Sequence, residues 1–508
     1  MLKRTVLLFL LMAQCLHVAC QAQQSKKVRP AGVAGSFYPA DPKELAGMVD
    51  GLLAKAVVPK FQDVVAVISP HAGYEYSAGV AAHSYAVLKG RKIDRVVVIA
   101  PSHVEAFPFS AIYDGTAYST PLGEVPVDRE FAAKLAKASK SIQISGRGHG
   151  PVGDRWEHAV EVQLPFLQRV LGQFKLVPIV MGDQSYEACR ALGLALAKNM
   201  QGTNTIIVAS SDLSHYHPYD DAVKLDHATL KAIEEWDYLS MSQNFERKIW
   251  EACGGGPIIA AMIASERLGA RQAQLLKYAN SGDATGDHSS VVGYGAMAIH
   301  GGASQGPAAD APFTLGPAEK DELFRIARGS VESAVRNKKL LDYPGSKLEA
   351  LNRERGAFVT LKIKGQLRGC IGYVSPTKPL ALTVRDVAAA AAVEDTRFRP
   401  VPVQELGSLE YEISVLSPMR RVLDVKDVKV GRDGLVMLQG RYEGLLLPQV
   451  PTEQGWERTT FLNQTCGKAG LPEDCWKDDR TDIFSFTALV LDEHQPKPVE
   501  PVSGTPRP

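Results

Sequence analysis

Histidine and acidic side chains follow three short apolar runs, each at the point where a predicted strand ends. The runs and the residues after them are DVVAVIS with His71, DRVVVIA with His103, and NTIIVA with Asp212 and His215. In open α/β sheets, the loops beyond the carboxyl ends of neighbouring strands converge on one site. The sequence therefore predicts that these side chains lie together and form a metal or polar catalytic site.

A cysteine is the fourth candidate member of this site. Cys253 precedes three glycines and the start of an apolar helix. A thiol near a helix N-terminus is expected to have a lowered pKa, and glycines let a backbone approach a site closely. Imidazole and thiolate together suit zinc, iron or copper better than magnesium or calcium. Hydrogen-bonded loop histidines and a buried small thiol are the alternatives for each residue taken alone.

Strands alternating with helices must position these residues. The β-branched runs at 63–69, 94–100, 174–182 and 204–211 predict strands, and a helical pattern covers 157–171. Such near-continuous apolar strands are typical of a largely parallel sheet that is buried on both faces. Two further strand-like runs, QLLKYAN at 274–280 and SSVVGYGAMAIH at 289–300, are joined by a Gly/Asp loop, so the sheet is expected to be mixed at an edge. The first domain is therefore predicted to be α/β.

Length and composition predict more than one domain. A chain of 508 residues is longer than a single hydrophobic core ordinarily supports. Its contents of 45% hydrophobic and 22% charged residues are typical of a globular protein. A net charge of +1 gives no electrostatic footprint for nucleic acid, which excludes a nucleic-acid role. Residues 303–313, rich in Gly, Ala and Pro, predict a linker between domains at 28–302 and 314–492. Residues 493–508 predict a disordered, Pro-rich tail.

The second domain reads as α+β and contains one candidate reactive thiol. A helical pattern at 320–337 precedes strand signals, including a hairpin that turns at Lys364 and Gly365. Cys370 lies two positions after Arg368, so a regular strand would place both side chains on one face and lower the thiol pKa. The domain contains no histidine, so only Glu412, Asp395 or another domain could supply a base. A packed structural thiol is the alternative.

The N-terminus predicts export. The basic stretch MLKR precedes an apolar run of about 15 residues, which suits a signal peptide at 1–22 and is short for a transmembrane span. HVAC, ending at Cys20, resembles a bacterial lipobox and predicts a lipid anchor, whereas cleavage near Ala22 is the alternative. We expect a periplasmic or envelope-anchored protein with no transmembrane span. Among five remaining cysteines, Cys466 and Cys475 could pair, or a helix between them could hold them apart.

Six motifs in the first domain together resemble the Memo family over residues 28–302. In chain order they are PHAGYEYSAG, PSH, EHAVEVQLPFL, SSDLSHY, CGGGP and GDHSSVVGYGA. The resemblance implies a fold similar to the class III extradiol dioxygenases. It also implies a metal at His71, His103 and Cys253, with iron most often proposed and copper or zinc as alternatives. Those dioxygenases use two histidines and a carboxylate, so the cysteine departs from their pattern.

The resemblance also implies roles for neighbouring residues. His215 occupies the place of an acid/base histidine, and Asp212 could orient it or a metal-bound water. Glu157 and His158 could support the metal ligands or simply cap a helix. A tyrosine-rich rim is suited to a substrate, a peptide or another partner, and comprises Tyr74, Tyr76, Tyr216 and Tyr219.

The second domain resembles the AMMECR family over residues 318–490. The motifs are LRGCIGY, EDTRFRPV, YEISVLSP and a long stretch from 444 to 476. Memo and AMMECR proteins occur with a radical-SAM protein in the AmmeMemoRadiSam set, which implies such a partner. This chain has no C-x3-C-x2-C cluster motif of its own, and export would separate it from such an enzyme. The leading hypothesis is a metal-dependent, dioxygenase-like oxidoreductase, and the alternatives are a non-catalytic adaptor or a metal-handling protein.

Overall fold

The protein is described here by a computed structural model that covers residues 27–301 and 313–493. These residues form two compact units. The first unit ends at Glu234 and resumes at Trp250, and the second takes Glu235–Ile249 together with the residues from 313 onward. Several expectations fall outside the described residues: the leader at 1–22, lipidation at Cys20, all but the last residue of the linker at 303–313, and residues 494–508 of the tail.

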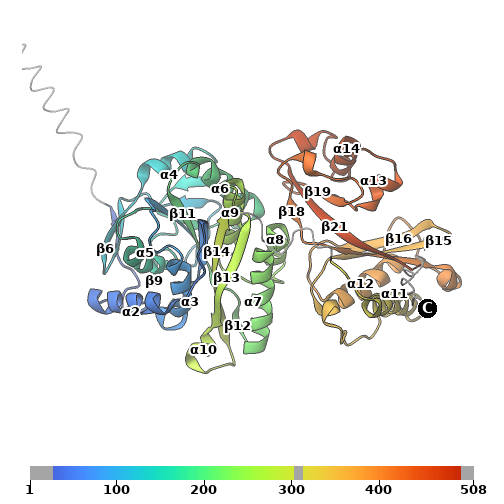
Figure 1. The fold of residues 1–508 in the computed structure, drawn as a ribbon, viewed down its shortest axis with the longest axis horizontal. Helices are drawn as coiled ribbons and strands as arrows, with labels where there is room; N and C mark the ends of the chain where they lie inside the picture. The colour runs from blue at the N-terminus through green and yellow to red at the C-terminus, as the bar shows by residue number, and fades with distance from the viewer. Residues whose placement is uncertain (1–26, 302–312, 494–508) are drawn as a thin grey trace, which may run out of the picture. The chain divides into compact units, whose positions relative to one another are not determined.

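A nine-stranded mixed sheet forms the centre of the first unit (Figure 1). Its strands run in the order β12-β14-β2-β11-β3-β10-β4-β7, and β13 pairs with β14. The inner strands β2, β11, β3 and β10 are parallel, whereas β14 is antiparallel to β2. The predicted α/β class is therefore confirmed. The strands are β2 (Asp63–Ser69), β3 (Arg95–Pro101), β4 (Ser110–Ile112), β7 (Ile142–Ile144), β10 (Lys175–Met181), β11 (Thr205–Ser210), β12 (His215–His217), β13 (Gln272–Asn280) and β14 (Val291–Gly301).

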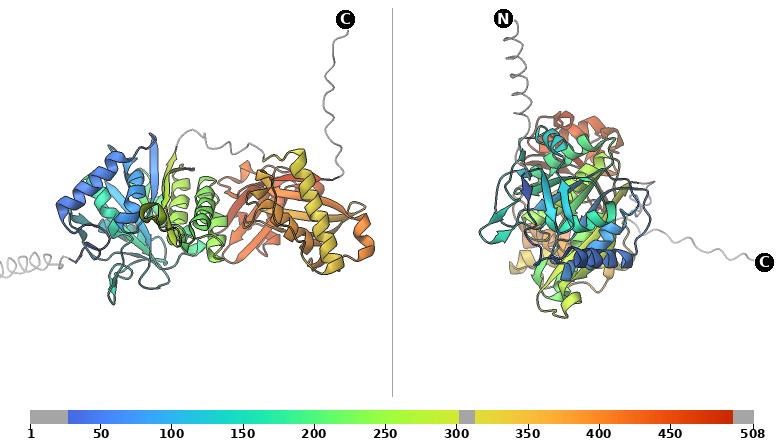
Figure 2. Two further views of the ribbon diagram at one scale, coloured as in Figure 1. Left: turned by 90° about the horizontal axis from the view of Figure 1, so that it is seen from below. Right: turned by 90° about the vertical axis from the view of Figure 1, so that its left-hand side faces the viewer.

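Helices cover both faces of this sheet, which explains its unbroken apolar strands. Val96, Val98 and Ala100 of β3 belong to the core shared with α2 (Pro42–Lys55), α3 (Tyr74–Ala86) and α5 (Leu164–Leu171). The alternate residues of β3 are equally buried, because α9 (Gly255–Arg267) and its neighbour α6 (Tyr186–Met200) cover the other face (Figures 1 and 2). Side chains alternate between faces along a strand, so a sheet enclosed on both sides requires apolar residues at every position.

Smaller elements surround this sheet. A second, three-stranded sheet joins β1, β5 and β6, and β8 pairs with β9 as a short hairpin. Their bounds and those of the other helices of the first unit are β1 (Val28–Arg29), β5 (Ala117–Thr120), β6 (Gly123–Pro126), β8 (Pro151–Val152), β9 (Arg155–Trp156), α4 (Arg129–Ala136), η1 (Glu161–Gln163), α7 (Tyr219–Glu234) and α10 (Ser281–Thr285). The helix α8 (Tyr238–Glu246) belongs to the second unit.

The helix predicted at 157–171 begins later than expected. Helical backbone starts at η1 and continues into α5, whereas Glu157 and His158 are irregular and only Ala159 and Val160 form a turn. The Glu157 carboxylate accepts hydrogen bonds from the backbone N–H groups of His158 (2.9 Å) and Ala159 (3.0 Å). A side chain that satisfies nearby N–H groups in this way competes with the helical pattern.

The parallel register brings three loops to one edge of the sheet. Ser210 of β11 is paired with Ser69 of β2, and Ala209 is paired with Ile99 of β3. The loops that follow these three adjacent strands therefore leave the sheet side by side. The start of α9 approaches the same edge, because a Cβ on Gly254 would lie 2.2 Å from the carbonyl oxygen of Ser210. Only glycine permits so close an approach of two backbones.

An antiparallel, seven-stranded sheet forms the centre of the second unit, in the order β16-β15-β17-β21-β19-β20 with β18 on β21. Helices α11 and α12 pack against β15, β16 and β17, and α14 packs against β19 and β20. The predicted α+β class is confirmed. The elements are α11 (Pro317–Asn337), α12 (Leu380–Val393), α13 (Gln449–Glu453), α14 (Arg458–Lys468), β15 (Ala357–Ile363), β16 (Gln366–Tyr373), β17 (Glu410–Leu416), β18 (Arg420–Arg421), β19 (Asp433–Gln439), β20 (Tyr442–Leu446) and β21 (Asp482–Asp492), with 3-10 turns at Glu349–Asn352, Val403–Ser408, Val425–Asp427 and Cys475–Lys477.

Two local features of the second unit settle points that the sequence raised. The hairpin turns at Lys364 (φ 50°) and Gly365 (φ 74°), and two positive φ angles are those of a type I′ turn. Cys466 and Cys475 form a disulfide bond, with both residues buried.

Across residues 27–301 and 313–493, no helix is both long and apolar enough to cross a membrane.

Candidate metal centre

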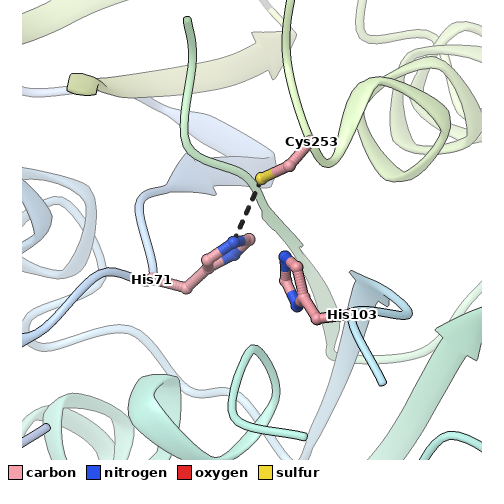
Figure 3. A group of neighbouring side chains, drawn as sticks. All are labelled: His71, His103 and Cys253. Atoms are coloured by element: carbon pink, nitrogen blue, oxygen red, sulfur yellow. Dashed lines mark hydrogen bonds between the residues drawn. The ribbon is translucent and has the colours of Figure 1, made fainter. Parts of the chain in front are cut away.

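Two histidines and a cysteine converge at the carboxyl edge of the first sheet. His71 follows β2, His103 follows β3, and Cys253 precedes α9 (Figure 3). One ligand atom from each lies within 4.8 Å of the others, and Cys253 Sγ is 3.1 Å from His71 Nε2. Nitrogen and sulfur ligands of one tetrahedral ion lie roughly 3.5 Å apart. The three side chains therefore fit the coordination of a single metal ion.

His103 is held by a buried carboxylate. Its Nδ1 lies 3.0 Å from Glu157 Oε1, and its backbone N–H donates to Glu157 Oε2 at 2.6 Å. Burial alone would raise the pKa of Glu157, but the hydrogen bonds and charge of His103 outweigh burial and lower it to about 2. A carboxylate that accepts the Nδ1 proton leaves Nε2 free to bind a metal, as in many metal sites. Glu157 thus supports a ligand in addition to shaping its own turn.

His71 is almost fully buried between two polar partners. Its backbone N–H donates to Asp212 Oδ1 at 2.7 Å, and its ring Nδ1 lies 2.8 Å from Ser210 Oγ. Burial, followed by the neighbouring His103, lowers the pKa of His71 well below its ordinary value. The ring is therefore neutral at physiological pH, which is the form that binds metals.

The Cys253 thiol differs from the sequence expectation. Burial, and then the negative charge of Asp212, raise its pKa, whereas its position before α9 predicted a lowered one. The thiol accepts a hydrogen bond from the backbone N–H of Asp212 (3.3 Å) and lies 3.1 Å from His71 Nε2. Desolvation here outweighs the helix dipole. A bound cation would have to displace the thiol proton, as metal ligands require.

Asp212 and His215 lie beside the cluster. Burial raises the pKa of Asp212 to about 6, and the hydrogen bond from the backbone of His71 opposes that rise. His215 Nδ1 lies 2.9 Å from the carbonyl oxygen of Leu213, which can only accept a hydrogen bond. The Nδ1 atom therefore carries a proton, so Nε2 is the atom of the neutral ring that can accept one.

The two histidines of the cluster, His71 and His103, line a pocket of about 650 Å³. Tyr216 lies at this pocket with 76% of its surface exposed and a φ of 63°, which is strained for a residue other than glycine. The pocket is large enough for a small molecule. Its lining includes His71, His103, His158, Asp212, His215, Arg155, Phe37, Tyr76, Tyr216 and Tyr294.

The two tyrosines at the start of α3 have different positions. Tyr76 lines the pocket, as the sequence predicted. Tyr74 does not: it is buried in the core, and its hydroxyl donates to the carbonyl oxygen of Val162 at 2.7 Å. Residues two apart on a helix point in nearly opposite directions, so only one of them can face the pocket.

His158 is a further histidine of the pocket. Its ring stacks on His103 at 4.7 Å between centroids and contacts Phe37 at 4.4 Å. Burial, followed by the nearby His103, lowers the pKa of His158 to about 4, so its ring is neutral. With His103 and Glu157 it also forms a second group of ligand atoms within 4.8 Å of one another.

Two buried polar residues of the site were not predicted. Ser210 contacts the ring of His71, and Gln163 contacts Ser210. Both belong to the Memo-like motifs EHAVEVQLPFL and SSDLSHY, but the sequence predicted no role for them. In a sequence, a neutral side chain that supports a metal ligand cannot be distinguished from any other buried polar residue. Its role becomes visible only when the structure shows which ligand it contacts.

Comparison with known proteins identifies the first part of the chain. Residues 29–298 match the family described as Memo-like protein. The chain belongs to the Memo family. MEMO1 family proteins of Methanopyrus kandleri and Methanocaldococcus jannaschii are 38% and 36% identical to it over 286 and 291 residues, and each alignment covers 54% of this chain and 99% of the relative. The Memo domain thus spans nearly the whole length of these relatives.

The second part of the chain matches the AMMECR1 family over residues 324–491. An uncharacterised protein of Pyrococcus horikoshii with a solved structure is 40% identical, and the match covers 36% of this chain and 96% of that protein with a TM-score of 0.35. The two family matches together show that the chain joins a Memo domain and an AMMECR1-type domain.

The candidate thiol of the AMMECR1-type domain has structural partners. Arg368 pairs with Glu405 at 2.7 Å, and Glu412 pairs with Lys362 at 2.8 Å. Burial raises the pKa of Cys370, which corrects the expectation that Arg368 would lower it. These contacts favour the alternative of a packed thiol.

The RGCIG and EDTRF motifs meet at the edge strand β16. The backbone N–H of Cys370 donates to Asp395 Oδ2 at 2.8 Å, and Arg397 donates to the carbonyl oxygen of Cys370 at 3.1 Å. These two side chains occupy the groups that an edge strand would otherwise leave unpaired. A Cβ on Gly369 would lie 2.2 Å from the carbonyl oxygen of Ala391 in α12, so this glycine permits close helix packing.

Proposed function

We propose that the Memo domain is a metal-dependent enzyme, most simply an oxidoreductase with non-heme iron. The observation that carries this proposal is the convergence of ligand atoms from His71, His103 and Cys253. Two of these residues, His71 and His103, line a pocket that can hold a small molecule. Three protein ligands leave a coordination position open, which is typical of catalytic rather than structural metal sites. The related fold of the extradiol dioxygenases, implied by the sequence motifs, supports redox chemistry.

The surrounding residues are suited to proton transfer and to orienting a ligand. His215 can accept a proton at Nε2, and Asp212 can hold the peptide after β2 in place through the backbone of His71. Bound iron or copper would supply Lewis-acid and one-electron chemistry. Aromatic side chains such as Phe37 and Tyr294 would exclude water from a bound substrate.

Anaerobic titration of the metal-free protein with Fe(II), Cu(I) and Zn(II) tests this proposal. Cys253→Ser is expected to weaken binding of the preferred ion by at least tenfold. Cys189→Ser is the matched control, because Cys189 is a buried thiol of α6 outside the cluster, and it should bind as the wild type does. Equal binding by all three proteins would refute the assigned ligand set.

A non-catalytic adaptor or metal-handling protein is the second candidate, favoured by the exposed and strained Tyr216 at the pocket. His215→Ala separates the two. An enzyme should lose turnover while its metal content stays unchanged, whereas an adaptor should keep its partner affinity. Tyr216→Ala should weaken partner binding if the adaptor hypothesis is correct.

We also propose that the chain is exported, either to the periplasm or to a lipid anchor at Cys20. The disulfide between Cys466 and Cys475 supports export, because such bonds persist mainly in oxidising compartments. Cell fractionation and mass spectrometry of the mature N-terminus test this proposal. A chain recovered from the cytosol with both thiols reduced would refute it and would favour the radical-SAM partner that the AmmeMemoRadiSam resemblance implies.

A further inference from the structure

A chain of buried hydrogen bonds connects the core to His71. Its members come from four different elements: Tyr85 from α3, Gln163 from η1, Ser210 from the end of β11, and His71 after β2. Each of these residues is at most 2% exposed. Buried polar groups of this kind are costly unless each donor meets an acceptor, so their arrangement can be worked out atom by atom.

The orientation of Gln163 is determined by a carbonyl group. One side of its amide lies 3.0 Å from the carbonyl oxygen of Pro70, which can only accept a hydrogen bond. That side must therefore be the donor Nε2, and the other side is Oε1, which accepts from the hydroxyl of Tyr85. The same Nε2 also donates to Ser210 Oγ at 2.8 Å.

Ser210 in turn determines the proton position on His71. Its hydroxyl lies 2.7 Å from the carbonyl oxygen of Ala159, so its single proton is donated there. Ser210 Oγ then has only acceptor capacity for Gln163 and for His71 Nδ1, which lies 2.8 Å away. His71 must therefore carry its proton on Nδ1, and in the neutral ring Nε2 has a free electron pair.

We propose that Ser210 and Gln163 are positioning residues that hold His71 in the Nδ1-protonated tautomer with Nε2 directed to the metal. The two histidine ligands then differ in the partner of Nδ1: a carboxylate holds His103, and a neutral hydroxyl–amide pair holds His71, while the Asp212 carboxylate lies 3.8 Å from His71 Nε2. A carboxylate at Nδ1 raises the basicity of its histidine, whereas a neutral partner at Nδ1 determines the tautomer without adding charge at that nitrogen. Two measurements test this inference, the tautomer of His71 and the affinity for a metal ion, and only the second rests on the proposed function.

Nuclear magnetic resonance of the full-length, metal-free protein with ring-¹⁵N-labelled histidine tests the tautomer directly. His71 signals are assigned by their loss in His71→Ala. The wild type should carry the His71 proton on Nδ1. Ser210→Ala removes the acceptor, and we expect a shift of the His71 proton toward Nε2, where it can donate to Cys253 Sγ.

Co(II) binding, followed by the thiolate absorption of Cys253, provides the second readout. Ser210→Ala should weaken Co(II) binding by about 10- to 100-fold, and Ser210→Thr, which keeps the hydroxyl, should recover most of it. Ser84→Ala is the matched control. Ser84 is also fully buried and donates to a backbone carbonyl, that of Ile68, so its loss should leave the tautomer and the Co(II) affinity unchanged.

The outcomes separate this proposal from the proposed function. A wild-type proton on Nε2, or an unchanged tautomer in Ser210→Ala, would overturn the positioning role. An affinity loss in Ser84→Ala equal to that in Ser210→Ala would also overturn it, by indicating general destabilisation. If no variant and not even the wild type binds Co(II), the metal function fails, while the tautomer measurement still decides the role of Ser210.

Discussion

At the scale of single residues, the two histidine ligands have different partners at Nδ1. Glu157 is buried and ionised beside His103 Nδ1, whereas the neutral hydroxyl of Ser210 holds His71 Nδ1 and the Asp212 carboxylate lies 3.8 Å from His71 Nε2. The thiol of Cys253 stays protonated because burial and Asp212 disfavour the thiolate. The sequence predicted these residue types but not their protonation, because protonation depends on burial and on neighbours distant in the chain.

Glu157→Gln tests the charged support of His103. The amide keeps the shape of the side chain but removes the charge that strengthens the histidine as a ligand. We expect metal affinity to fall about tenfold with little loss of stability, as measured by titration and by urea unfolding. Unchanged affinity would show that the carboxylate serves only the local turn.

His149 makes stability of the Memo domain depend on pH. Its Nε2–H donates to the carbonyl of Ala111 and its Nδ1 accepts from Tyr118, and burial lowers its pKa to about 4. In the unfolded chain the pKa of His149 is near 6.5, so as pH falls the unfolded state binds a proton at this residue before the folded state does. The free energy of unfolding therefore decreases below about pH 6.5. Between pH 7.5 and 5 this residue should contribute a loss of about 2 kcal/mol.

Urea unfolding at the two pH values checks this expectation. His149→Gln cannot titrate in this range, so its stability should depend less on pH than that of the wild type. The other buried histidines would keep part of the dependence in both proteins. Identical dependence on pH in the two proteins would contradict the assignment.

At the scale of secondary-structure elements, the hydrophobic pattern of the sequence was most informative for strands whose side chains are buried on both faces of the sheet. The parallel strands were predicted because an enclosed sheet needs apolar residues on both faces. The start of the helix at 157–171 was wrong because Glu157 satisfies the local N–H groups itself. The placement of Tyr74 was wrong because the sequence did not determine which face of α3 lies against the core.

Gly254→Ala tests the close approach of α9 to the sheet edge. The added Cβ would meet backbone at 2.2 Å, so the segment that carries Cys253 must move. We expect at least a tenfold loss of metal affinity and a loss of stability of about 1–3 kcal/mol.

Gly47→Ala in α2 provides the control for this substitution. A Cβ there meets no atom within 4 Å, and alanine favours helix. That variant should gain about 0.5–1 kcal/mol of stability and bind metal normally. Normal metal binding by Gly254→Ala would show that the loop tolerates the shift.

At the scale of the whole molecule, two family domains with different chemistry share one chain. The Memo domain contains the histidine cluster, whereas the AMMECR1-type domain contains the disulfide and a thiol held by structural contacts. Motif order predicted both families, because each motif set spans most of its domain. The pairing of Cys466 with Cys475 could not be predicted, since the path of the chain between them decides it.

The disulfide should stabilise the AMMECR1-type domain. It closes a loop with a sequence separation of 9 residues, and loops of that size contribute about 2–3 kcal/mol. A Cys466→Ala/Cys475→Ala variant should unfold at a lower temperature than the wild type. Reductant should lower the unfolding temperature of the wild type but not that of the variant, and equal effects on both would contradict the pairing.

The most direct test of the metal centre is the metal content of the full chain purified anaerobically from its own host. The comparison is a His71→Ala/Cys253→Ser double variant prepared in the same way. If this cluster is the metal centre, the wild type should contain near-stoichiometric metal, with iron expected, and the variant none, with both proteins folded. Equal metal content in the two folded proteins, or no metal in either, would contradict the assignment of this cluster as a metal centre.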